Sequence, residues 1–305
     1  MTEGGAAAQA SVNSARRCAF LTMDSTEGWC IDADLGIAPL EARNWTVDWV
    51  RWRTAGVPWD RYDAVYIGVP WDYPEDVRGF LSLLERIDRS RAVLVNDLSL
   101  VRWTLTKTYL RDLERRGTDI VPSLWYERMP RGELAAWFER LDAPQLIVKP
   151  VVSTNASDTF LLGEDTAEER LLLHAFRDRA LVVQPFIANI QSEGEYSLFY
   201  FGNEFSHAIR KLPKSEDFRV QEEYGADIRG TDPEPAMIET ADRVLRLVDP
   251  TPVYARVDFV RGPDGRFLLM ELELIEPSLY LRMHPAAPMR FAAAFDRYVT
   301  AVNWW

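Results

Sequence analysis

The chain of 305 residues is 47% hydrophobic and 27% charged, which is typical of a globular protein with two average domains or one large α/β unit. Its 35 Lys and Arg residues are outnumbered by 47 Asp and Glu residues, so the formal net charge is −12. Nucleic-acid binding depends on clustered basic side chains that neutralise phosphates, and this charge therefore predicts no nucleic-acid partner.

The N-terminal segment and the cysteines indicate where the protein works. Residues 1–15 are rich in Ala, Gly and Ser, and we expect a disordered leader rather than a signal peptide or a membrane anchor. No stretch approaches the roughly 18 apolar residues of a membrane span, so we expect no membrane partner. Cys18 and Cys30 are too few for a disulfide framework or a zinc cluster. These features predict a cytoplasmic protein.

The first hundred residues alternate short apolar runs with helical patterns, which predicts βαβ units and a parallel sheet. We expect strands at 18–23, 46–52, 64–69 and 92–95, and helices near 39–44 and 76–87. Ligands of such sheets bind beyond the carboxyl ends of the strands. The loops at 24–27 and 71–73 are therefore where a substrate is expected.

From residue 104 onward the pattern changes to one helix at 104–115 and then to strands that read as antiparallel. The expected strands are 146–151, 181–187, 196–201 and 204–212, with Gly202 and Asn203 as the turn between the last two. A helix at 235–247 precedes a hairpin of strands 253–260 and 267–275, and a terminal helix covers 288–302.

The final hairpin carries the strongest chemical pattern. Strand alternation places Arg256 and Asp258 on one face of the first strand, and Glu271 and Glu273 on one face of the second. If Asp258 lies near Glu271, all four side chains converge. Three acids so placed repel one another unless a cation neutralises them, and oxygen ligands suit Mg²⁺. The alternative is a solvated strand face, which periodicity alone does not distinguish.

Three lysines lie at spaced positions upstream of the hairpin: Lys107, Lys149 and Lys211. Lys149 follows the apolar run 146–148, where an ammonium group is costly without an anionic partner, so it suggests a bound ligand. Lys107 fits a surface helix lysine equally well.

This set of residues resembles the ATP-grasp superfamily of ADP-forming carboxylate–amine ligases over about residues 100–280. The likeness is closest to the branch of bacterial glutathione synthetase and ribosomal-protein glutamate ligase. Within that branch, the Trp-Asp-Tyr loop at 71–73 and the segment 271–279 are similar to D-cycloserine-forming ligases. The resemblance implies an α/β (α+β) architecture. A Rossmann-like N-terminal domain (16–103) would be followed by a small (104–182) and a large (183–305) α+β subdomain that sandwich ATP.

The resemblance also implies roles for individual residues. Lys107, Lys149 and Ser153 would contact the nucleotide phosphates, and Glu195 would hold the ribose. The adenine edge would be read by the hinge of Gln184, Pro185, Phe186 and Ile187. The transferring phosphoryl group would be stabilised by Lys211, Arg219 and Arg256. Magnesium, as two ions, would be bound by Asp258, Glu271 and Glu273.

Two positions depart from the superfamily pattern. The loop after the second lysine is usually rich in glycine, whereas residues 152–157 contain none. The third metal ligand is often Asn and is Glu273 here. An extra carboxylate should tighten magnesium binding while it repels a substrate carboxylate.

The implied activity is an ADP-forming ligase of antibiotic or other natural-product biosynthesis, which joins an activated carboxylate to a nitrogen. A small-molecule kinase on the same fold and an inactive nucleotide-binding module are the alternatives. We expect a homodimer and a small amino-acid-like substrate.

For that substrate, Asp24, Glu27 and Asp72 would bind an ammonium group, Trp71 and Tyr73 would wall an apolar part, and Arg282 would pair with a carboxylate. Asp72 is equally suited to cap the following helix.

Overall fold

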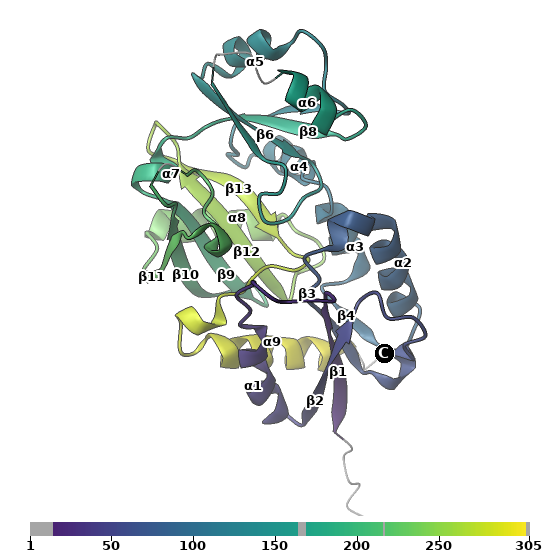
Figure 1. The fold of residues 1–305 in the computed structure, drawn as a ribbon. Coiled ribbons are helices and arrows are strands. Elements are labelled where there is room, and N and C mark those ends of the chain that lie inside the picture. The colour runs from purple at the N-terminus through teal and green to yellow at the C-terminus, as the bar shows by residue number, and fades with distance from the viewer. Residues whose placement is uncertain (1–14, 164–168, 216, 303–305) are drawn as a thin grey trace, which may run out of the picture.

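The computed structural model describes residues 15–163, 169–215 and 217–302. The leader expected at 1–15 falls almost wholly outside these ranges. Within them the chain forms three sheets, stacked from the N-terminal sheet at the bottom of Figure 1 to the smallest unit at its top. No helix in the described part combines the length and apolar character that crossing a bilayer requires.

The first sheet is parallel throughout, as predicted, with the order β2-β1-β3-β4. Its strands are β1 (Arg16–Thr22), β2 (Trp45–Arg51), β3 (Ala64–Val69) and β4 (Val93–Val95). Its helices are α1 (Ile37–Glu41), α2 (Val77–Asp88) and α3 (Leu98–Thr104). All six residues of β3 are buried, which explains its continuous apolar sequence, since a central parallel strand is covered on both faces.

The helix expected at 104–115 is confirmed only from Tyr109 onward: α3 ends at Thr104, and α4 (Tyr109–Arg115) begins after a break. Helix α3 begins before the predicted range, at Leu98. Asp97 caps its N-terminus, because the Asp97 carboxylate accepts the N–H groups of Ser99 and Leu100. In the break, the main-chain N–H of Lys107 donates to the Val151 carbonyl at 2.8 Å. This hydrogen bond ties Lys107 to the segment that follows Lys149.

The second sheet is antiparallel and has the order β5-β8-β6-β7. It consists of β5 (Leu124–Tyr126), β6 (Gln145–Pro150), β7 (Phe160–Gly163) and β8 (Leu181–Pro185), with α5 (Leu134–Leu141) and α6 (Glu169–Ala175). Four of these elements, β5, β7, α5 and α6, were not predicted from the sequence. The sheet and these two helices enclose a separate core around Trp137 and Phe176.

The third sheet is also antiparallel, with the order β11-β10-β9-β12-β13. Its strands are β9 (Glu195–Phe201), β10 (Glu204–Leu212), β11 (Asp227–Thr231), β12 (Tyr254–Arg261) and β13 (Phe267–Glu273), and its helices are α7 (Asn189–Ser192) and α8 (Pro235–Arg246). The turn at Gly202 and Asn203 is confirmed. Short 3-10 turns lie at 33–36, 59–61, 73–76, 222–224 and 281–283.

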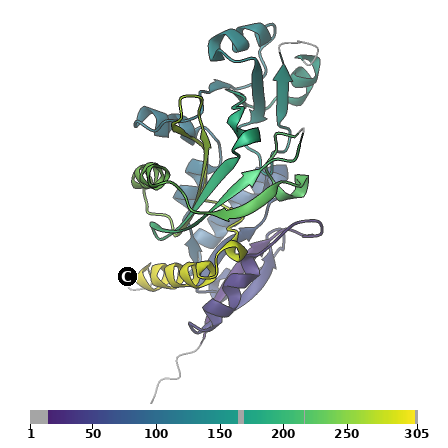
Figure 2. The same cartoon turned by 90° about the vertical axis from the view of Figure 1, so that its left-hand side faces the viewer.

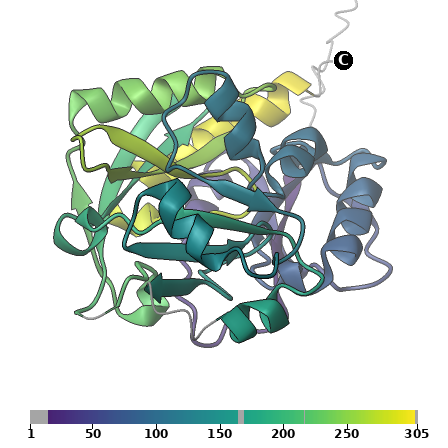
Figure 3. The same cartoon turned by 90° about the horizontal axis from the view of Figure 1, so that it is seen from above.

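The C-terminal helix α9 (Ala287–Val302) joins the first and third sheets. Its Phe291 and Phe295 pack in one core with Phe20 of β1 and Phe199 of β9. Figure 2 shows α9 between the two sheets, and Figure 3 shows the same arrangement from above. This shared core fixes the loops of the first sheet against the ends of β12 and β13.

Candidate active site

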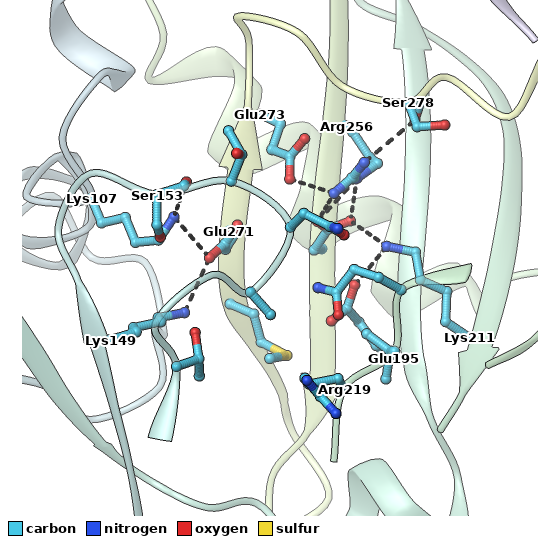
Figure 4. Close-up of a pocket in the computed structure, with 18 of the residues that line it drawn as sticks. Lys107, Lys149, Ser153, Glu195, Lys211, Arg219, Arg256, Glu271, Glu273 and Ser278 are labelled. Carbon is cyan, nitrogen blue, oxygen red and sulfur yellow. Dashed lines mark hydrogen bonds and ion pairs between the residues drawn. The ribbon is translucent and has the colours of Figure 1, made fainter. Parts of the chain in front are cut away.

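The register of the β12–β13 hairpin brings the predicted acids together. Asp258 pairs with Glu271, and Arg256 pairs with Glu273. Directly opposite residues of an antiparallel pair share a face, and one carboxylate oxygen each of Asp258, Glu271 and Glu273 lies within 4.8 Å of the others. The predicted shared face is confirmed. Figure 4 shows Arg256, Glu271 and Glu273 on this face among the residues that line the cavity.

Asp258 is the most enclosed of the three acids, with 2% of its surface exposed. Its carboxylate accepts the Ser197 hydroxyl of the adjacent strand β9 at 2.6 Å and the Arg256 Nε at 3.0 Å. Arg256 also pairs with Glu273. Burial opposes the charge of Arg256, but Asp258 and Glu273 raise its pKa above the ordinary value. A solvated strand face is therefore excluded at Asp258.

Glu271 is held by two lysines from other elements. Its Oε1 lies 3.1 Å from Lys149 Nζ and 3.2 Å from Lys107 Nζ. Burial alone would raise the pKa of Glu271, but the two ammonium groups lower it far below its usual value. The anionic partner that the apolar strand around Lys149 required is thus a residue of the chain itself. The surface-helix interpretation of Lys107 is wrong, since its side chain is only 12% exposed.

A second buried ion pair closes the other side of the acidic face. Lys211 Nζ lies 2.8 Å from Glu195 Oε1 and 4.0 Å from Asp258 Oδ1. Burial raises the pKa of Glu195, partly offset by Lys211. Burial likewise raises the pKa of Glu273, against the opposing charge of Arg256. One wall of the cavity therefore carries carboxylates and cationic side chains close together, where burial strengthens the interactions between their charges.

The hinge expected to read adenine has one donor already in use. The N–H of Phe186 donates to the Gln145 carbonyl at 2.9 Å, and the Gln184 amide donates to Ser123 Oγ at 2.9 Å. The N–H of Phe186 is therefore already engaged within the protein, and the adenine-binding role of the hinge stays a prediction. An apolar cluster remains beside the hinge that could take a flat ring; it includes Val121, Phe186, Ile187, Val220, Val260 and Met270.

The loop after β6 reaches left-handed conformations without glycine. Asn155, Ala156 and Asp158 have φ of 49°, 52° and 52°, which is the region that glycine usually occupies. Thr154 Oγ1 donates to the Trp71 carbonyl at 2.9 Å. Ser153 lines the cavity, and its carbonyl accepts Lys107 Nζ at 3.4 Å. Contacts to neighbouring elements thus hold the loop where glycine is absent.

All of these elements line one cavity of about 220 Å³. Arg219 lines it while pairing with Asp217 at 2.8 Å and stacking 3.8 Å from the centre of the Tyr224 ring. Gln221 Oε1 is buried at the same cavity and has no hydrogen-bond partner in the described residues. A buried acceptor without a donor is costly, and a ligand N–H or O–H would satisfy it.

The expected substrate residues separate into two groups. Trp71 and Tyr73 line the cavity, whereas Asp24, Glu27, Asp72 and Arg282 are not among its lining residues. The Asp72 carboxylate accepts the Trp52 indole N–H at 2.6 Å and pairs with Arg53. It makes no hydrogen bond to the helix that follows, so the cap interpretation is wrong. The substrate role of Asp72 stays a prediction.

Arg282 is bound within the protein. Its guanidinium lies 3.0 Å from Asp32 and pairs with Glu222. Sequence reasoning missed Trp29, Cys30 and Glu276, which do line the cavity. Glu276 belongs to the segment 271–279 that carried the family resemblance, and this position was the available signal. His207 is buried: its Nε2–H donates to the Leu279 carbonyl, and its Nδ1 accepts the Ser206 hydroxyl. It is not among the residues that line the cavity.

Comparison with known proteins places these features in a family. Residues 18–96 match the family model described as the D-cycloserine synthetase DcsG N-terminal domain. The cycloserine biosynthesis protein DcsG of Streptomyces lavendulae is 32% identical over 266 residues, which cover 80% of this chain and 85% of that protein.

Solved structures agree. The crystal structure of D-cycloserine synthetase DcsG superposes with a TM-score of 0.81 at 27% identity, covering 93% of this chain and 99% of that one. D-alanine–D-alanine ligase from Bacillus anthracis has the same fold, with a TM-score of 0.67 at 14% identity over 95% of this chain and 99% of that one. The chain therefore belongs to the D-cycloserine synthetase family of ATP-grasp carboxylate–amine ligases, enzymes that use ATP to form C–N bonds.

Proposed function

We propose that this ligase activates a carboxylate of a small amino-acid-like substrate with ATP and Mg²⁺ and joins it to a nitrogen, as a step in the biosynthesis of an antibiotic related to D-cycloserine. The observation that carries the proposal is the convergence of three acids and four cations on one cavity wall. These are Asp258, Glu271 and Glu273 with Lys107, Lys149, Lys211 and Arg256. The relative whose name includes cycloserine biosynthesis supports the pathway class.

The acidic face fits magnesium. Asp258, Glu271 and Glu273 offer only oxygen ligands, from positions close enough to share an ion. The ATP-grasp ligase PsnB, a structural neighbour, has been solved in complex with Mg and ADP, which supports this assignment. Two ions fit the charge better than one, because three carboxylates and the phosphates of a nucleotide would otherwise leave a large negative excess. Magnesium, when bound, would neutralise charge on the phosphates.

The neighbouring cations would then change partners. Lys107 and Lys149 both pair with one carboxylate, that of Glu271. A phosphate group could therefore bind one or both lysines, and Glu271 would keep an opposite charge beside it if it became a magnesium ligand. Lys107, Lys149 and Ser153 would hold the phosphates, residues 184–187 would bind adenine, and Glu195 would contact the ribose.

The reaction itself needs no side-chain nucleophile. A substrate carboxylate oxygen attacks the γ-phosphorus, the bond to the ADP oxygen breaks, and an acyl phosphate forms. The nitrogen then attacks the acyl carbon, the C–O bond to phosphate breaks, and the nitrogen loses a proton. Lys211, Arg219 and Arg256 would stabilise the charge on the transferring phosphoryl group.

The direct test is product analysis. Protein incubated with ATP, Mg²⁺ and amino acids should release ADP and free phosphate in equal amounts, together with a new amide or ring. A stable phosphorylated product would instead support a kinase, and the absence of any ADP would support a binding module. Family membership does not favour either alternative.

Three further expectations stay predictions. They are the homodimer, the cytoplasmic location and the subdomain boundaries at 103 and 182. Sedimentation velocity measures the first, localisation of a tagged protein the second, and limited proteolysis the third.

A further inference from the structure

The end of the cavity away from the hinge is formed by loops of the first sheet and by the segment after β13. Trp29 and Trp71 lie with their ring centres 5.1 Å apart. The Trp71 indole N–H donates to the main-chain carbonyl of Glu276 at 2.8 Å. Cys30, Tyr73 and Glu276 line the same end. This end of the cavity therefore brings an aromatic pair and a carboxyl group together.

Glu276 differs from the other enclosed acids of the cavity in having no cation. Asp258, Glu271, Glu273, Glu195 and Glu222 each lie within ion-pair distance of a Lys or Arg. For the carboxylate of Glu276, the described residues provide neither an ion pair nor a hydrogen bond from another side chain; only its own main-chain N–H contributes. A partly buried carboxylate without a counter-charge is costly, which is the usual mark of a ligand site.

The charges around Glu276 do not offset the free-energy cost of burying its ionised carboxylate. Burial, together with the charge of Glu273, raises the pKa of Glu276 to about 8, although Lys107 and Arg256 act in the opposite direction. Those two cations already contact other carboxylates, Lys107 with Glu271 and Arg256 with Asp258 and Glu273. A positive group that arrives with the substrate would favour the ionised carboxylate and restore the balance.

We propose that Glu276 binds the ammonium group of the substrate, with the Trp29–Trp71 pair against the same cation. Indole faces attract cations, and they also wall the apolar part of a small amino acid. This inference rests on the proposed function and specifies its substrate: the molecule whose carboxylate is activated carries a free amine close to it. It replaces the loop acids Asp24, Glu27 and Asp72, which do not line the cavity.

The test measures binding, without turnover. Protein saturated with ADP and Mg²⁺ is titrated by calorimetry with a panel of D- and L-amino acids, each paired with the analogue that lacks the amine, such as alanine with propionate. We expect Glu276→Gln to weaken binding of the best amino acid at least about 10-fold, the scale of one charge-assisted hydrogen bond. Binding of its deaminated analogue should change less than about 2-fold. Glu276→Asp should recover part of the loss.

Two controls separate this inference from the proposed function. Asp24→Asn, a loop acid outside the cavity lining, should bind the amino acid as the wild type does. ADP binding with Mg²⁺ should be unchanged in Glu276→Gln; failure of the wild type to bind ADP would contradict the proposed function instead. Equal loss for the amine and its deaminated analogue would overturn the ammonium site. So would unchanged affinity in the variant, or no amino acid binding to a wild type that binds ADP.

Discussion

The two ends of the cavity are built in different ways. At the nucleotide wall, the acids project from β9, β12 and β13, where strand register sets their spacing. Each of these acids has a cation within reach, and Lys107 and Lys149 reach Glu271 from outside the sheet. At the opposite end the surface is formed by loops, with contacts such as that of Trp71 to Glu276, and the carboxyl of Glu276 has no cation partner among the described residues. The acids of the nucleotide wall are thus paired with cations before any ligand binds, whereas the carboxyl of Glu276 at the loop end would gain a cation only from a ligand.

The most severe damage should follow from opening the buried pair at the wall. Lys211→Met leaves Glu195 without its cation at a site where both side chains are less than 10% exposed. Removing one partner of a buried pair costs about 3–5 kcal/mol. We expect a loss of this size in the free energy of unfolding, measured with urea. Arg210→Met is the matched control, since Arg210 adjoins Lys211 on β10 and has no ion pair in the described residues.

For the control we expect a change within about 0.5 kcal/mol, as for ordinary surface substitutions. Equal losses in the two variants would show that the wall does not depend on its buried ion pair.

The second prediction concerns catalysis at the same wall. Asp258→Asn removes one charge of the acidic face and leaves Arg256 with a weaker partner. ATP turnover should fall at least about 100-fold, as for other losses of preorganised charge. ADP release in a coupled assay measures it. Asp264→Asn, at the exposed turn of the same hairpin, should keep wild-type turnover.

A fall of similar size in Asp264→Asn, or turnover near the wild-type rate in Asp258→Asn, would contradict a specific catalytic role for the acidic face of the hairpin.

The third prediction tests the unpaired carboxyl at the loop end through pH. The pKa of Glu276 is about 8 in the folded protein, against an ordinary value of 4.5. Between these two pH values the carboxyl is protonated in the folded protein and ionised in the unfolded chain. Its contribution to stability is therefore complete below pH 4.5 and is lost as the pH rises to about 8. Relative to the wild type, Glu276→Gln should gain roughly 3 to 4 kcal/mol between pH 5 and pH 8, because each pH unit between the two pKa values changes the stability by about 1.4 kcal/mol.

Urea unfolding of both proteins across this pH range provides the measurement, with no nucleotide or amino acid present. A difference that stays constant with pH would mean that Glu276 is compensated within the protein.

The smallest effect is expected where a loop acid is already satisfied. Asp72→Asn weakens the hydrogen bond from Trp52 and the pair with Arg53. The substitution should lower the free energy of unfolding by about 1 kcal/mol and leave the KM for the amino-acid substrate unchanged. Thermal unfolding and steady-state kinetics check both parts. A KM raised 10-fold at unchanged stability would return Asp72 to the substrate site.

The contrast between strands and loops also explains what the sequence could predict. Alternation with period two is a property of the strand itself, so Asp258, Arg256, Glu271 and Glu273 could be placed on one face before their partner strand was known. The parallel first sheet was predictable for a different reason: continuous apolar runs such as that of β3, alternating with helical patterns, are typical of parallel strands that are covered on both faces.

Loop side chains have no such rule. Asp72 follows a parallel strand, as substrate residues often do, but Trp52 and Arg53 capture its carboxylate. Lys107 was placed inside a helix because residues 104–115 have helical periodicity, whereas its N–H bonds to Val151 in the break between α3 and α4. Both outcomes depend on residues distant in the sequence, which a local pattern does not contain.

The central claim is that the acidic face of Asp258, Glu271 and Glu273 binds the nucleotide through magnesium. Calorimetric titration of ADP with and without Mg²⁺ tests it most directly, in the wild type and in the Asp258→Asn/Glu271→Gln double variant. We predict that Mg²⁺ strengthens ADP binding at least about 10-fold in the wild type, an effect of about 1.4 kcal/mol, and leaves it unchanged in the double variant. Equal strengthening in both proteins would contradict the claim.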